Sequence, residues 1–178
     1  MSSLAILIPN YNGAAFIAET ATRFIEGFPG AMVVVVDDAS SDDSVARLAS
    51  TAARILVREN NGGFAAAVNT GLKFLVEYGC EYVLVANSDV FAAERECAAI
   101  TVTTSVAMMD PKICVLGFLE ESVQSSTAYE GSNISGFLFV LRLAVIEKVG
   151  YFDESFFMYG EEQDYFRRIQ EAGFVIRQ

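Results

Sequence analysis

The sequence predicts an α/β protein in which a mostly parallel sheet is flanked by helices on both faces. Short apolar runs alternate with longer stretches of helical periodicity over the first two-thirds of the chain, a pattern typical of a doubly wound sheet. The apolar runs are continuous, as in residues 32–36, which is expected of parallel strands covered on both faces. Polar clusters follow these runs, so the strand ends are expected to border a ligand crevice.

Turn-forming residues separate the elements expected in the first half. We expect strands at residues 4–8, 32–36, 54–57 and 82–86, and helices at residues 14–28, 44–52 and 64–78. A turn cluster from Pro9 to Gly13 closes the first strand, and Pro29-Gly30 stops the first helix. Serine and aspartate at 40–43 are N-cap residue types for the second helix. The third helix opens with two glycines and carries a stripe of apolar residues.

The second half is expected to complete the same domain. From its sequence we expect a helix at 92–109, a strand at 113–118, a loop or short hairpin at 120–135, an apolar run at 136–141, and helices at 144–149 and 161–172. No low-complexity tract or linker interrupts the chain. Residues 1–178 are therefore interpreted as a single domain.

The composition excludes several classes of chemistry. Acidic residues outnumber basic ones 23 to 12, and the formal net charge is −11. Such a charge repels phosphate backbones and anionic lipid, so nucleic acid is not expected as a partner. The chain contains no histidine, which excludes histidine bases and the common imidazole zinc sets. Acid–base or metal chemistry must therefore use carboxylates.

The cysteines indicate a reducing compartment, and the sequence shows no targeting segment. Cys80, Cys97 and Cys114 are odd in number and form no CxxC pair, which is typical of free thiols in a cytosolic protein. No apolar run reaches the roughly 18 residues of a membrane span, and the N-terminus has no basic signal-peptide region. We expect a cytoplasmic protein without a transmembrane segment, and its oligomeric state cannot be read from the sequence.

Acids collect after two of the expected strands. Asp37 and Asp38 follow the second strand, and Asp89 closes the short polar turn Asn87-Ser88-Asp89 after the fourth. Aspartate also terminates strands and caps helices, so a purely structural role is the alternative for each. Carboxylates in a crevice can hold Mg²⁺ or Mn²⁺, with water and diphosphate oxygens completing the coordination.

Two further segments stand out. The run from Gly62 to Gly71 opens a helix with two glycines; it suits either a phosphate at the helix N-terminus or close packing on the sheet. The run from Phe156 to Asp164 delivers three carboxylates to a helix N-terminus directly after aromatic residues. These acids either complement the helix dipole or include a general base of raised pKa.

Together these segments resemble the inverting family 2 glycosyltransferases, which have the Rossmann-like GT-A fold. Residues 6–13 resemble the opening strand and turn of this family, and the segment from Val36 to Ser44 resembles its nucleotide-binding segment. Residues 59–71 are similar to the Asn-Gly-Phe-Ala stretch of the rhamnosyltransferase-like subgroup. Asn87-Ser88-Asp89 stands where that family carries its Asp-x-Asp motif. Residues 136–142, 150–154 and 161–168 resemble its acceptor-side region and its Glu-Asp base motif. The resemblance covers nearly the whole chain.

The resemblance implies a role for each matching residue. The nucleotide-sugar site would be lined by Pro9, Tyr11, Asp37, Asp38, Asn61, Gly62, Asn69, Asn87 and Ser88. Asp38 would meet the edge of the pyrimidine ring, and Asp89 would bind the metal, Mg²⁺ or Mn²⁺. Glu162, beside Glu161, would deprotonate the acceptor hydroxyl, and Asp164 and Arg168 would support that helix. Residues 1–90 would form the nucleotide-sugar-binding half and residues 91–178 the acceptor-side half.

The implied activity is a metal-dependent sugar transfer with inversion, typical of polysaccharide biosynthesis. The donor would be a UDP- or dTDP-sugar and the acceptor a carbohydrate or glycolipid, with the protein either cytoplasmic or peripheral to the inner face of the membrane. The sequence departs from the family pattern at Asn87, which replaces an aspartate, and at Glu162, which is one methylene longer than the usual base. Family members also continue past this point and commonly supply a later histidine, so the C-terminal part is expected to be missing.

Two alternatives follow from these departures and from the acids themselves. One is a GT-A remnant that binds nucleotide with weak or no catalysis. The other is a phospho-acceptor receiver domain, with Asp89 as the acceptor and Lys112 as its lysine. Against the receiver domain, the acidic pair follows the second strand instead of the first, and Lys112 precedes its strand.

Overall fold

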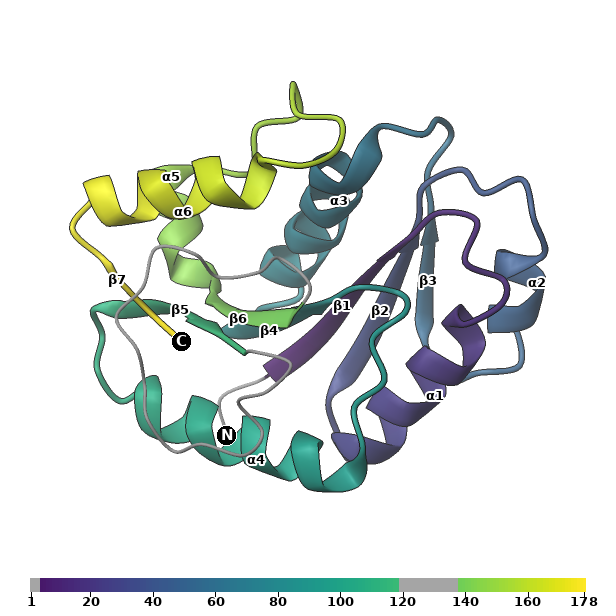
Figure 1. Ribbon diagram of the computed structural model, residues 1–178, viewed down its shortest axis with the longest axis horizontal. Helices are drawn as coiled ribbons and strands as arrows, with labels where there is room; N and C mark the ends of the chain where they lie inside the picture. The colour runs from purple at the N-terminus through teal and green to yellow at the C-terminus, as the bar shows by residue number, and fades with distance from the viewer. Residues whose placement is uncertain (1–3, 119–137) are drawn as a thin grey trace.

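In the computed structural model, which describes residues 4–118 and 138–178, one sheet carries helices on both faces (Figure 1). The strands are β1 (Leu4–Asn10), β2 (Met32–Asp37), β3 (Arg54–Val57), β4 (Tyr82–Ala86), β5 (Ile113–Gly117), β6 (Leu138–Arg142) and β7 (Val175–Arg177). The helices are α1 (Ile17–Gly27), α2 (Ser44–Leu48), α3 (Gly63–Glu77), α4 (Glu94–Ala107), α5 (Ile146–Val149) and α6 (Glu161–Glu171), with a 3₁₀ turn, η2 (Leu143–Val145), before α5. The expected α/β class is confirmed.

The seven strands lie in the order β3-β2-β1-β4-β6-β5-β7. The pairs β3–β2, β2–β1, β1–β4 and β5–β7 are parallel, whereas β6 runs antiparallel to both β4 and β5. The sheet is therefore mostly parallel, as expected. The alternation of strand and helix that predicts parallel pairing ends before β6, and this strand reverses direction.

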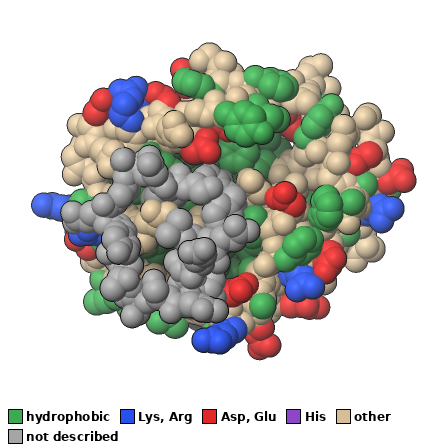
Figure 2. Space-filling model, viewed as in Figure 1, with side chains coloured by type: hydrophobic (Ala, Val, Ile, Leu, Met, Phe, Trp, Pro, Cys, Tyr) green, Lys and Arg blue, Asp and Glu red, His purple; other side chains and the backbone are tan. Residues whose placement is uncertain are grey.

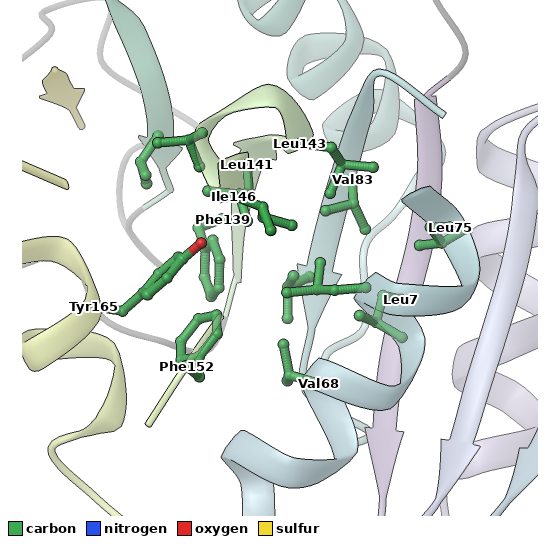
Figure 3. Packing of buried hydrophobic residues seen from close by; sticks show 14 of the residues in the cluster. Leu7, Val68, Leu75, Val83, Phe139, Leu141, Leu143, Ile146, Phe152 and Tyr165 are labelled. Atoms are coloured by element: carbon green, nitrogen blue, oxygen red, sulfur yellow. The ribbon is translucent and has the colours of Figure 1, made fainter. Parts of the chain in front are cut away.

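The core consists of two clusters, one on each face of the sheet. Leu7 points to the α3 face, where it lies near Val68 and Leu75 in a cluster that extends to Tyr165 (Figure 3). Its neighbours in β1, Ile6 and Ile8, belong to the opposite cluster with residues of α1, α2 and α4. Because both faces of β1 are covered, every residue from Ala5 to Asn10 is buried, which explains its continuous apolar run.

Several boundaries differ from the expected ones for local reasons. The first helix begins at Ile17 instead of residue 14, because the carbonyl of Gly13 accepts hydrogen bonds from Phe16 and Ile17 in a preceding turn. The strand β7 is an addition that the sequence did not predict. It has three residues, and the N–H of Val175 donates to the carbonyl of Lys112.

The side chain of Arg142 links the end of β6 to the C-terminal end of α4. From the end of β6, the guanidinium of Arg142 donates to the carbonyls of Met108, Asp110 and Ile113. It also stacks over the ring of Tyr82. These bonds satisfy carbonyls at the C-terminal end of α4 and beyond it. The expected loop or hairpin at 120–135 lies outside the described residues, as does the beginning of the apolar run at 136–141.

No helix in the described part of the chain is both long and apolar enough to cross a membrane. Cys97 and Cys114 are buried and Cys80 is half-buried, and no disulfide joins any of these three described residues. Burial raises the pKa of both Cys97 and Cys114.

Candidate functional site at the strand ends

The carboxyl ends of β1 and β2 lie side by side and are locked together by side chains. Asn10, the last residue of β1, pairs in register with Asp37, the last residue of β2. The Nδ2 group of Asn10 donates to Oδ1 of Asp37 at 2.8 Å, and Ser40 donates to Asp37 through both its Oγ and its backbone N–H, at 2.7 and 2.9 Å. Asp37 is 1% exposed. Its carboxylate therefore organises the turn that follows β2.

Asp38 connects the end of β2 to the N-terminus of α3. Its buried carboxylate accepts hydrogen bonds from the backbone N–H groups of Gly62 and Gly63, the second at 2.8 Å, and forms an ion pair with Arg58. The first N–H groups of a helix have no partner within the helix, and negative charge is favoured there. The N–H of Gly63 also donates to Oδ1 of Asn61 at 3.0 Å. The predicted residues Asp38, Asn61 and Gly62 are thus brought together.

Gly63 lets a distant loop approach the same point. It has a φ of +81°, and a Cβ atom there would lie 1.9 Å from the carbonyl oxygen of Phe157. The backbone of the loop between α5 and α6 therefore rests on the N-terminus of α3, at the top of Figure 1. This contact places the aromatic loop next to the glycines that bind Asp38.

The turn Asn87-Ser88-Asp89 lies at the end of β4 and is anchored to α1. The buried hydroxyl of Thr20 donates to the carbonyl of Ser88 at 2.7 Å. A Cβ atom on Gly13 would lie 3.5 Å from the hydroxyl oxygen of Ser88, so this turn also borders the loop after β1. Asn87 and Ser88 are half-buried and Asp89 is exposed. Of the other predicted residues, Pro9 is buried in β1 and Tyr11 is 50% exposed.

The oxygen donors at this turn fit a hard divalent cation. Mg²⁺ and Mn²⁺ are commonly bound through one or two carboxylates, with the rest of their coordination left to water and substrate phosphates. The exposed carboxylate of Asp89, with amide and hydroxyl oxygens adjacent in sequence, matches such a donor set. Within residues 4–118 and 138–178, no group of three or more His, Cys, Asp or Glu side chains could hold an ion by itself.

The carboxylates at the N-terminus of α6 have unsatisfied oxygens. Glu161 is 4% exposed and Glu162 is half-buried. The Oε2 atom of each is buried, and within residues 4–118 and 138–178 no group donates a hydrogen bond to it. Burial raises the pKa of Glu161, and the neighbouring charge of Glu162 adds to the effect. A carboxyl group of raised pKa can hold or accept a proton closer to neutral pH.

The third acid of this helix is held by arginines. Asp164 accepts from Arg168 Nε at 2.7 Å and from Arg167 Nη2 at 2.8 Å. Partial burial opposes ionisation of Asp164, but these hydrogen bonds and charges hold its pKa below the usual value. Arg168 also donates to the carbonyls of Val149 and Tyr151. Asp164 and Arg168 therefore fasten α6 to the segment that precedes the aromatic loop.

Asn69 fastens the same segment from the opposite side. This residue is 1% exposed in α3. Its Nδ2 group donates to the carbonyl of Phe152 and to Oε1 of Glu154, both at 2.9 Å, and its Oδ1 accepts from the N–H of Phe152 at 3.0 Å. Underneath, the rings of Phe152 and Tyr165 stack at 4.1 Å (Figure 3). The role of Asn69 at the nucleotide sugar stays a prediction, and the structure shows its bonds to the loop.

Sequence reasoning did not identify Arg58, Thr20 or Asn10 as part of this arrangement. Arg58 follows β3 directly, and strand-end position alone could have identified it as a partner for Asp38. On the face in Figure 2, hydrophobic side chains gather at the upper edge, where Figure 1 places the loop before α6. Phe157, Met158 and Tyr159 of that loop are each more than half exposed.

Comparison with known proteins supports this interpretation of the fold. The profile of "Glycosyl transferase family 2" matches residues 5–101, which is more than half of the chain. No curated protein matches significantly. The chain resembles the mannosyltransferase PcManGT from Pyrobaculum calidifontis, solved with GDP-Man and Mn²⁺, with a TM-score of 0.75 and 21% identity over 97% of this chain and 53% of that one.

It also resembles S. aureus TarS 1-349 in complex with UDP, with a TM-score of 0.73 and 22% identity over 98% of this chain and 57% of that one. The chain thus spans little more than half the length of these structures. Their fold agrees with the expected GT-A architecture, and the family match favours it over a receiver domain. The profile match and the strand-end arrangement lead to one conclusion: the chain belongs to glycosyl transferase family 2.

Proposed function

We propose that this chain forms the donor-binding and catalytic part of an inverting glycosyltransferase of the rhamnosyltransferase-like subgroup. The observation that carries the proposal is the chain of contacts along one edge of the sheet. It runs from Ser88 past Gly13 to the end of β1, through Asp37 and Asp38 to the N-terminus of α3, and on to Phe157. Four residues further along, Glu161 opens α6. Residues 1–90 would bind the nucleotide sugar and residues 91–178 the acceptor.

The proposed donor is a UDP- or dTDP-sugar. The nucleoside would lie by Pro9, Tyr11 and Asp38, and the diphosphate by the turn Asn87-Ser88-Asp89. A Mg²⁺ or Mn²⁺ ion on Asp89 would neutralise charge on the leaving diphosphate. PcManGT was solved with GDP-Man and Mn²⁺, and TarS with UDP, which supports a nucleotide-sugar donor and a divalent ion. The acceptor would be the hydroxyl group of a carbohydrate or glycolipid, and the setting the cytoplasm or the inner membrane face.

The proposed reaction is one displacement at the anomeric carbon. The acceptor oxygen forms a bond to that carbon while the bond to the diphosphate oxygen breaks, and the nucleoside diphosphate leaves with the electron pair. Glu162 takes the proton of the acceptor hydroxyl. Its buried Oε2, to which no group in the described part of the chain donates a hydrogen bond, is the feature that supports this role. Asp164 and Arg168 position α6, and attack opposite the leaving group inverts the anomeric centre.

A donor screen tests the proposal. UDP-, dTDP- and GDP-sugars are titrated calorimetrically with Mn²⁺, and release of nucleoside diphosphate is then measured with simple sugar acceptors. We expect binding of one donor class, loss of most Mn²⁺-dependent affinity in Asp89→Ala, and unchanged affinity in Asp110→Ala, an exposed acid outside the site. Binding without nucleoside diphosphate release would favour the nucleotide-binding remnant over the enzyme.

A further inference from the structure

The solvent side of α4 carries an apolar stripe that nothing in the proposed reaction uses. The opposite side of this helix is buried, with Cys97, Ile100 and Thr104 facing the protein. On the exposed side, Val102 is 64% exposed, Val106 66% and Met109 82%. With exposed Ala99, these positions are separated by three, four and three residues. That spacing is typical of the seam between two packed helices.

Between its two ends, α4 itself carries no charged side chain. No charged residue occurs from Cys97 to Met109, although the chain carries a formal net charge of −11. Two copies of such a protein repel each other over most of their surfaces. They can approach along α4, at the lower edge of Figure 1, without bringing carboxylates together.

We infer that α4 is a self-association surface and that its occupant is α4 of a second copy of this chain, packed antiparallel about a two-fold axis. Such an axis pairs a patch with itself, so the stripe must be self-complementary. With the axis between Val102 and Thr103, Ala99 of each copy lies opposite Val106 of the other. The small side chain of Ala99 therefore faces the larger side chain of Val106 on both sides of the axis, and no charged residue lies between them.

The charged residues at the two ends of the helix fit this antiparallel register. Arg95 and Glu94 are exposed at the N-terminal end, and Asp110 and Lys112 are exposed just beyond the C-terminal end. In the register above, Arg95 lies opposite Asp110 of the second copy, and Glu94 lies next to Lys112 of the second copy. Each pair occurs twice by symmetry. A parallel arrangement would place Arg95 opposite Arg95 and would lose this complementarity.

Sedimentation velocity over a concentration series tests the inference. A single helix pair buries less than the roughly 1,200 Å² at the lower limit of stable complexes. We therefore expect a reversible monomer–dimer equilibrium with a dissociation constant on the order of micromolar or weaker. Monomers throughout the series would overturn the inference. The experiment needs no donor or acceptor, so its result is independent of the proposed enzymatic function.

Substitutions locate the interface. Val102→Glu places two carboxylates next to the two-fold axis and should weaken dimerisation at least about tenfold. The control is Val76→Glu, the same change at an exposed valine of α3 on the other side of the sheet, where Val76 is 41% exposed. The control should dimerise as the wild type does. A dimer that is unaffected by Val102→Glu would overturn the inference, since the contact would lie elsewhere.

A charge swap tests the register. Arg95→Asp should weaken the dimer about three- to tenfold, because two symmetric pairs change from attraction to repulsion. Adding Asp110→Arg should restore affinity, while Asp110→Arg alone should again weaken it. Arg95 lies at the start of α4 and Asp110 lies beyond its end, and the 14 residues of this helix span about 21 Å, so the rescue cannot arise within one copy. Equal affinities for the single and double variants would rule out this antiparallel register.

Discussion

The buried carboxylates on the two sides of the candidate site differ in how many hydrogen bonds they accept. On the proposed donor side, Asp37 and Asp38 are almost fully buried, and hydrogen bonds from Asn10, Ser40 and the α3 N-terminus satisfy them. On the proposed acceptor side, Glu161 and Glu162 each have a buried carboxylate oxygen to which no group in residues 4–118 and 138–178 donates a hydrogen bond. The first pair holds loops in place, whereas each acid of the second pair has one oxygen that is not engaged in this way.

This difference in hydrogen bonding predicts different roles for the two pairs of acids. A carboxylate that accepts several hydrogen bonds is stabilised in its charged form and is a poor base. A buried carboxylate oxygen without a donor is costly, and such a cost is commonly found where function requires it. We therefore expect substitutions on the donor side to act on stability and donor affinity, and substitutions at Glu162 to act on turnover.

The largest expected effect is that of Glu162→Gln on turnover. Glutamine keeps the size of the side chain but cannot accept the proton of the acceptor hydroxyl. Loss of a general base costs about 10²–10⁴ in rate, so turnover of the donor should fall by that factor while donor affinity stays within about twofold. Glu171→Gln, an exposed substitution on the same helix, serves as the control. Wild-type turnover in Glu162→Gln would move the proposed base elsewhere.

Asp38→Ala is expected to have the next largest effect, on folding stability. It removes the acceptor for the Gly62 and Gly63 N–H groups and leaves Arg58 without its carboxylate. We expect a loss of about 2–4 kcal/mol in the free energy of unfolding, measured in denaturant. Asp43→Ala is the control, because the exposed side chain of Asp43 makes no capping hydrogen bond. If Asp38→Ala lost turnover but no stability, Asp38 would belong with the chemically active acids.

The sequence predicted the strands more accurately than the contacts between loops. Continuous apolar runs predicted β1, β2 and β4, because strands covered on both faces need an apolar residue at every position. The polar residues after these runs predicted that Asp37, Asp38 and Asp89 lie along the same edge of the sheet. The bonds of Asn69 to Phe152 join residues 83 positions apart. No local periodicity encodes such a pairing. The short strand β7 was missed for a related reason, since its pairing with β5 is a tertiary contact.

The same limit applies to the acids. The sequence showed that Glu161, Glu162 and Asp164 share a helix N-terminus, but three neighbouring carboxylates there have equivalent local surroundings. Burial distinguishes Glu161, and the partners Arg167 and Arg168 distinguish Asp164. Which acid is paired and which is left without a donor depends on packing between α6 and the segment before it.

The substitution Asn69→Ala tests whether the hydrogen bonds of α3 hold the segment before α6 in place. Asn69→Ala removes three hydrogen bonds to Phe152 and Glu154 and leaves backbone groups buried without partners. We expect a loss of about 1–3 kcal/mol in unfolding free energy and faster hydrogen exchange in residues 150–160. Thr70→Ala, which removes a bond only within α3, should leave exchange in that loop unchanged. Unchanged exchange in Asn69→Ala would show that α6 alone holds the loop.

The smallest expected effect is a pH-dependent gain in stability in Glu161→Gln. Burial raises the pKa of Glu161 in the folded protein, so the folded state favours the protonated carboxyl. The contribution of the protonated Glu161 carboxyl to stability is complete below the unfolded pKa of about 4.3 and is lost as the pH rises through the folded value.

Glutamine mimics the protonated form of Glu161. Glu161→Gln should therefore melt higher than the wild type at pH 7, by about 2–4 °C for each kcal/mol recovered, and the difference should disappear near pH 4. The control is Glu147→Gln, an exposed substitution on α5, which should leave the melting temperature within about 2 °C of the wild type at both pH values. A difference in melting temperature that stays constant with pH would mean that Glu161 is ionised at no cost in the folded protein, and the contrast between the two sides of the site would then rest on Glu162 alone.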